Sequence, residues 1–156
     1  MNEQKSLKIR LELVWWAVTA VVALAALLPL WKYLEYYPFL IANIAAIIAF
    51  ITFTRKIFLF QHSLLGNQQI IKMVLMVLCI PIFFYFINQV NAFQTVMDEQ
   101  GVDALLGPEQ EIGKLSLARY ARTEFVFFAV GSVIATVVFF FRMMISIWRY
   151  RNRGTV

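Results

Sequence analysis

The sequence predicts an all-α integral membrane protein in which four transmembrane helices form one bundle. Its 156 residues are 62% hydrophobic and only 15% charged, whereas soluble domains average roughly 45–50% apolar and about 25% charged residues. The apolar residues are concentrated in long runs, and the charged residues stand mostly between these runs. We therefore expect residues 1–156 to form a single transmembrane domain.

Four apolar runs have close to the ~20 residues that a helix needs to cross a bilayer. We expect the spans at about residues 13–31, 38–54, 73–90 and 123–148. The first run is too long for the apolar region of a cleaved signal peptide, and no small-residue cleavage site follows it, so it is expected to remain as a signal anchor. Residues 91–118 form the only long loop, between the third and fourth spans.

Lysine and arginine are unevenly divided between the two sets of span flanks, and cytoplasmic flanks carry the excess of these residues. Ten lie in one set: Lys5, Lys8, Arg10, Arg55, Lys56, Lys72, Arg142, Arg149, Arg151 and Arg153. Four lie in the other: Lys32, Lys114, Arg119 and Arg122. This asymmetry predicts that both termini are cytoplasmic and that the 91–118 loop is extracytoplasmic. The expected location is a plasma membrane, and the bacterial inner membrane is favoured.

Small side chains indicate where the helices pack, because they let helix backbones approach closely in lipid. The expected packing residues are Ala42, Ala45, Ala46 and Ala49 in the second span and Gly131 and Ala135 in the fourth. The third span has almost no small residues, so we expect it to be peripheral or to face a partner subunit. Pro81 removes one backbone hydrogen bond and predicts a kink in this span.

Two polar residues are the candidates for a functional site within the spans. Arg142 follows the apolar run of the fourth span, where its side chain either reaches the headgroups or contributes to a ring of arginines at the mouth of an oligomeric pore. Asn43, in the second span, is expected to form a hydrogen bond to another helix. Ionisable residues inside a membrane usually mark function, and the first three expected spans contain none.

No pattern in the sequence indicates catalysis, a cofactor or a metal. Cys79 is the single cysteine and His62 the single histidine, which excludes an intramolecular disulfide and a bis-histidine haem site. Nucleophile, metalloprotease and phosphate-loop motifs are absent. The net charge of +5 is explained by the topology, so we expect no nucleic-acid partner.

The sequence therefore favours a non-enzymatic role. We expect a structural or accessory subunit of a membrane complex, or a homo-oligomer, whose partners are the lipid bilayer and another membrane protein or a second copy of the chain. A homo-oligomeric pore with Arg142 near its cytoplasmic mouth is the alternative. A membrane-embedded enzyme is disfavoured because the sequence contains no catalytic motif. A small-solute transporter is disfavoured because the first three expected spans contain no charged residue.

Overall fold

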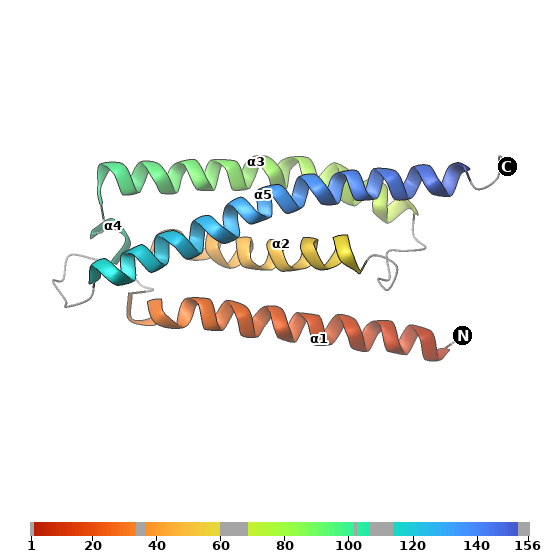
Figure 1. Ribbon diagram of the computed structural model, residues 1–156, viewed down its shortest axis with the longest axis horizontal. Coiled ribbons are helices and arrows are strands. Elements are labelled where there is room, and N and C mark those ends of the chain that lie inside the picture. Colours follow the sequence, from red (N-terminus) through yellow and green to blue (C-terminus); the bar gives the residue numbers. More distant parts are fainter. Residues whose placement is uncertain (1, 34–36, 60–68, 102, 107–113, 153–156) are drawn as a thin grey trace.

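The computed structural model describes residues 2–33, 37–59, 69–101, 103–106 and 114–152, and all regular structure in these ranges is helical (Figure 1). The elements are α1 (Asn2–Leu27), the 3-10 helix η1 (Leu28–Tyr33), α2 (Leu40–Phe58), α3 (Gln69–Glu99), α4 (Asp103–Leu106) and α5 (Lys114–Asn152). Four of the described helices are long and apolar enough to cross a membrane. The prediction of an all-helical chain with four such helices is confirmed.

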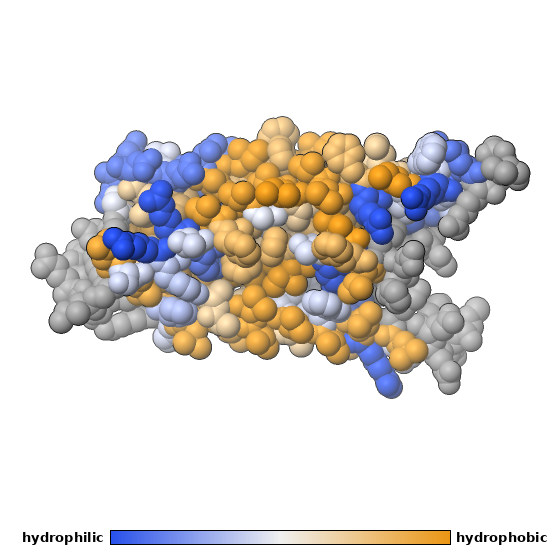
Figure 2. Space-filling view, viewed as in Figure 1, coloured by the Kyte–Doolittle hydropathy of each residue, from blue (hydrophilic) through white to orange (hydrophobic). Residues whose placement is uncertain are grey.

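An apolar belt surrounds the middle of the bundle. Figure 2 shows hydrophobic residues across the central part of the molecule and hydrophilic residues gathered toward both ends. Large apolar side chains such as Leu24, Val77 and Ile134 are more than half exposed in this belt. Such a surface is costly in water and favourable in lipid, so the belt has the composition expected of a multi-pass membrane protein.

The long helices alternate in direction along the chain. In Figure 1, α1 begins, α2 ends, α3 begins and α5 ends at the same end of the bundle, which we call the basic end because it holds Arg55, Lys56 and Lys72. The opposite end, where α3 finishes at Asp98 and Glu99, is called the acidic end. Consecutive long helices are therefore antiparallel.

The third and fourth long helices extend further than the expected spans. α3 continues to Glu99 and α5 begins at Lys114, so much of the segment expected as a loop, 91–118, is helical. At 1.5 Å per residue, the 31 residues of α3 measure about 46 Å and the 39 residues of α5 about 58 Å. Both exceed a hydrocarbon layer of about 30 Å. Hydropathy marks where a helix leaves lipid, and polar residues allow the same helix to continue into water.

α5 is the centre of the bundle, since it packs along both α2 and α3, while those two helices touch each other little. α1 packs chiefly along α2 at the edge of the bundle (Figure 1). The expectation that the third span would be peripheral was therefore wrong. Phe86 and Phe93 of α3 share one core with the small residues Ala118, Ala121 and Ala129 of α5. The small side chains that admit α3 thus belong to its neighbour.

Aromatic rings fill the core of the acidic end. Phe93 stacks on Phe125 with ring centroids 4.4 Å apart, and Phe39 lies 5.1 Å from Phe93 and 5.7 Å from Phe125. These rings come from α3, from α5 and from the residue that precedes α2. The three elements are joined here by one set of contacts.

Pro81 lies inside α3, and the helix continues on both sides of it. Its exposed ring borders a cavity of about 400 Å³ between α2 and α3, which Ala45, Ala49, Phe53, Ile82, Tyr85 and Phe86 also line. The kink expected at this proline stays a prediction.

Candidate functional site

Three polar side chains are buried together near the acidic end of the bundle: Tyr37, Asn43 and Glu124, called here the polar cluster. Their exposed fractions are 4%, 0% and 7%. A buried polar group is costly unless it forms hydrogen bonds, and a buried charge is more costly still. Burial of the polar cluster therefore costs free energy that hydrogen bonds within the bundle have to offset.

The local fold of each segment places these side chains. Pro38 cannot donate a backbone hydrogen bond, and α2 starts just after it, with the Leu40 amide donating to the Tyr37 carbonyl at 3.3 Å. Asn43 lies one turn further on, and its own amide donates to the Phe39 carbonyl at 2.8 Å. Glu124 is carried by α5 immediately before Phe125, whose ring is fixed by its stacking on Phe93.

One hydrogen bond joins the two helices of the polar cluster. Asn43 Nδ2 of α2 donates to Glu124 Oε2 of α5 at 2.6 Å. Three atoms of the cluster have no hydrogen-bond partner among the described residues: Tyr37 Oη, Asn43 Oδ1 and Glu124 Oε1. Burial, and next the nearby charge of Glu124, raise the pKa of the Tyr37 hydroxyl, so this group remains protonated at physiological pH.

A second buried polar contact lies toward the basic end. Lys72 of α3 is only 2% exposed, and its Nζ donates to Ser146 Oγ of α5 at 3.1 Å and to Gln69 Oε1 at 3.5 Å. By its place in the sequence, Lys72 is one of the basic residues expected in the flanks of the spans. The structure instead uses it to join two helices.

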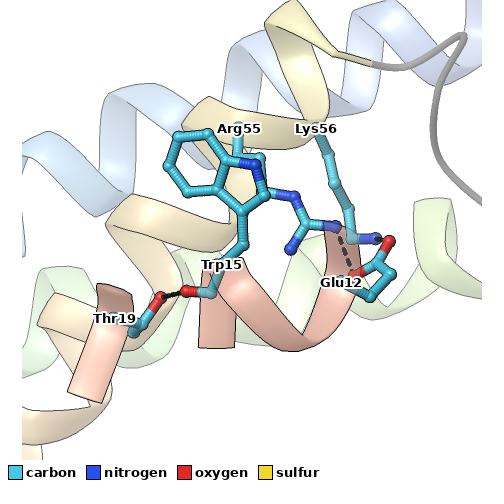
Figure 3. A network of polar contacts seen from close by, with 5 residues as sticks. All are labelled: Glu12, Trp15, Thr19, Arg55 and Lys56. Carbon is cyan, nitrogen blue, oxygen red and sulfur yellow. Dashed lines mark hydrogen bonds and ion pairs between the residues drawn. The ribbon is translucent and has the colours of Figure 1, made fainter. Parts of the chain in front are cut away.

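An ionic network fastens α1 to α2 at the basic end (Figure 3). Glu12 forms ion pairs with Arg55 and, at 3.8 Å, with Lys56. The Arg55 guanidinium also lies over the Trp15 ring, 5.8 Å from its centroid, within the range of cation–π attraction. One turn further along α1, Thr19 Oγ1 donates to the Trp15 carbonyl at 2.8 Å.

The expected packing residues lie at or beside the contact between α2 and α5. Ala42, Ala46 and Ala135 are buried, while Ala45 and Ala49 are partly buried beside the cavity. Ser132 Oγ donates to the Ala46 carbonyl at 2.8 Å, so a side chain of α5 bonds directly to the backbone of α2. A Cβ atom on Gly131 would lie 2.8 Å from the Phe50 ring, which means that glycine permits this approach.

Of the two polar residues singled out in the sequence, only Asn43 belongs to the polar cluster. Asn43 forms its bond to α5, as described above, whereas Arg142 is exposed on the outside of the bundle beside the buried Met143. Arg142 and Asn43 therefore do not share a site. His62 falls outside the described residues.

Glu124 is the functional candidate that sequence reasoning missed. It stands directly before the apolar run that begins at Phe125 and close to Arg122, which is the pattern of an ordinary charge at the end of a span. The signal that could have identified it is its register. Asn43 and Glu124 both lie near the acidic ends of antiparallel spans, which places them at one level of the bundle.

Among the described residues, no group of three or more histidine, cysteine, aspartate or glutamate side chains could hold a metal ion. Searches with known protein families, curated proteins and solved structures give no match to this chain.

Proposed function

We propose that the protein is a non-enzymatic structural or accessory subunit of a membrane complex. The observation that supports this role is how its buried polar groups are used. Asn43 with Glu124, Lys72 with Ser146, and Ser132 with the Ala46 carbonyl each join two different helices. The cavity beside Pro81 is lined almost wholly by apolar side chains, and so is a second cavity, which is bordered by Cys79, Ile80, Phe83, Thr136, Val137 and Phe140. Polar groups that hold helices together fit a scaffold better than a reaction centre.

The surface that we assign to a partner is the outer side of α1. This helix packs chiefly along α2, and Leu13, Val21 and Leu24 are each more than 60% exposed. Its position is already fixed at the basic end by the Glu12 network and near the acidic end by Tyr120, whose hydroxyl donates to the Ala26 carbonyl at 2.8 Å. A helix of another membrane protein, or of a second copy, could pack there without displacing α1.

We further propose that the basic end faces the cytoplasm of a bacterial cell, with both termini on that side, since basic residues are retained in the cytoplasm during insertion. Reporter fusions after residue 105 and at the C-terminus are expected to give opposite signals: an alkaline phosphatase fusion active only at the first site, a fluorescent protein only at the second. Equal signals at both sites would contradict this topology.

A homo-oligomeric pore is the second candidate, and the exposure of Arg142 on the outer face of α5 favours it. We expect the purified chain to show no conductance in planar bilayers and Arg142→Gln to insert and fold like the wild type, because the side chain reaches the headgroups. The native mass of the protein, measured in nanodiscs, gives its oligomeric state. A defined oligomer that conducts, and whose ion preference changes in Arg142→Gln, would replace the subunit proposal with the pore.

A further inference from the structure

The polar cluster has too few hydrogen-bond donors if Glu124 is ionised. Asn43 Nδ2 donates to Glu124 Oε2, and Asn43 also lies beside the Tyr37 hydroxyl. Two acceptors, Asn43 Oδ1 and Glu124 Oε1, have no donor among the described residues. The hydroxyl of Tyr37 has one proton, so it can donate to only one of them. With a carboxylate at position 124, an acceptor therefore stays unsatisfied inside the bundle.

The surroundings of Glu124 also disfavour a negative charge. At this level α3 contributes the Phe93 ring, and Tyr120, one turn before Glu124, uses its hydroxyl on the Ala26 carbonyl. Four other charged side chains are described toward the acidic end, and all are exposed: Asp98, Glu99, Arg119 and Arg122. In the part of the chain that the structure describes, no ion pair joins either arginine to Glu124. The carboxyl is thus 7% exposed without a neighbouring cation to balance a charge.

A proton on Glu124 removes both costs. It neutralises a carboxyl that would otherwise be buried as an unpaired charge, which is the more expensive form. It also converts Glu124 Oε1 from an acceptor without a donor into a donor, and Asn43 Oδ1 is an acceptor in the same cluster. The bond from Asn43 Nδ2 is kept, because Oε2 remains an acceptor. The neutral acid therefore fits the polar cluster better than the carboxylate does.

We propose that Glu124 binds a proton in the folded protein, and that release of this proton weakens the contact between α2 and α5. The hydrogen bond of Glu124 to Asn43 joins these two helices, and α5 is the helix along which both α2 and α3 pack. A charge created at Glu124 therefore acts on the central contact of the bundle. Because the folded chain holds a proton that the unfolded chain releases, stability falls as the pH rises. This pH response goes beyond the subunit role and does not depend on it.

The first test follows thermal unfolding of the full chain in nanodiscs by tryptophan fluorescence, from about pH 5 to about pH 9. The Tm of the wild type is expected to fall by about 4 °C or more over this range. Glu124→Gln carries a neutral side chain that both donates and accepts, so it should lose this dependence and be more stable than the wild type at the highest pH. Glu99→Gln, which changes an exposed carboxylate on α3, is the matched control and should follow the wild type. Parallel curves for the wild type and Glu124→Gln would overturn the proposal.

Infrared spectroscopy of the wild type is a second measurement that does not require Glu124→Gln to fold. In a detergent without ester groups, exposed carboxyl groups are ionised above about pH 6, so a carboxylic-acid carbonyl band that persists above this pH is expected from Glu124. Asn43→Ala should shift the loss of this band to higher pH, because the Nδ2 donor favours the ionised form. Absence of the band from the wild type would refute the site whatever the variants do, and so would an unchanged band in folded Glu124→Gln.

Discussion

Gly131→Leu is expected to be among the most destabilising single substitutions in this protein. Even a Cβ atom at this position would lie 2.8 Å from two carbons of the Phe50 ring. That ring is held in turn by Phe127 and Phe128, with centroids 5.5 and 5.8 Å away. The leucine would force α2 and α5 apart beside the Ser132 bond to Ala46. We expect a loss of about 1–3 kcal/mol or more in the free energy of unfolding, measured by denaturation in mixed micelles.

Two further substitutions make this experiment specific. Ala46→Leu adds bulk to a fully buried position on the other side of the same contact and should destabilise in the same direction. Phe84→Leu changes a side chain that is 59% exposed on α3 and should have little effect. If Phe84→Leu proves the most damaging of the three, the contact between α2 and α5 is not the main packing surface of the bundle.

Phe125→Ala is expected to have the second large effect. The Phe125 side chain is fully buried between Phe93 and Phe39, and its removal leaves a cavity that rigid helices cannot close. Phe→Ala changes in protein cores cost roughly 3–5 kcal/mol. Lipid is itself apolar, so the transfer part of this cost is reduced, and we expect about 3 kcal/mol in the same denaturation assay.

The matched control for this change is Phe141→Ala on the same helix. Its ring is 52% exposed, and its removal opens no enclosed cavity. A loss of stability in Phe141→Ala equal to that in Phe125→Ala would show that the effect comes from lipid contact or helix propensity and not from the ring cluster at the acidic end.

Hydropathy predicted the existence of the four long helices and not their ends. Lipid excludes charge, so the apolar runs are reliable markers of the belt. Nothing in a polar sequence stops a helix in water, and α3 continues nine residues beyond position 90, to Glu99. Which helices pack against each other could also not be predicted by inspecting each helix alone. The lack of small residues in α3 suggested a peripheral helix, but a close contact needs small residues on only one of its two partners.

Of the two residues that the hydrogen bond of the polar cluster joins, the sequence singled out Asn43 and not Glu124. Asn43 stands alone in an apolar run, so its polarity is conspicuous. Glu124 lies at the border of its run among other charged residues, and composition cannot distinguish a buried border carboxyl from a solvated one. That distinction depends on the rotation of α5, which the stacking of Phe125 on Phe93 fixes. The role of Lys72 was missed for the same reason, because its hydrogen-bond partner Ser146 lies 74 residues away in the chain.

The central position of α5 has a consequence for biogenesis. α2 and α3 make little contact with each other, and each packs along α5, which follows both of them in the chain. During synthesis the ribosome therefore releases α1, α2 and α3 into the membrane before the helix that unites them exists. The Glu12 network allows α1 and α2 to associate early as a hairpin, while α3 has to wait, with Phe86 and Phe93 uncovered. The interval before α5 emerges is when the nascent chain is most open to membrane proteases and insertion chaperones.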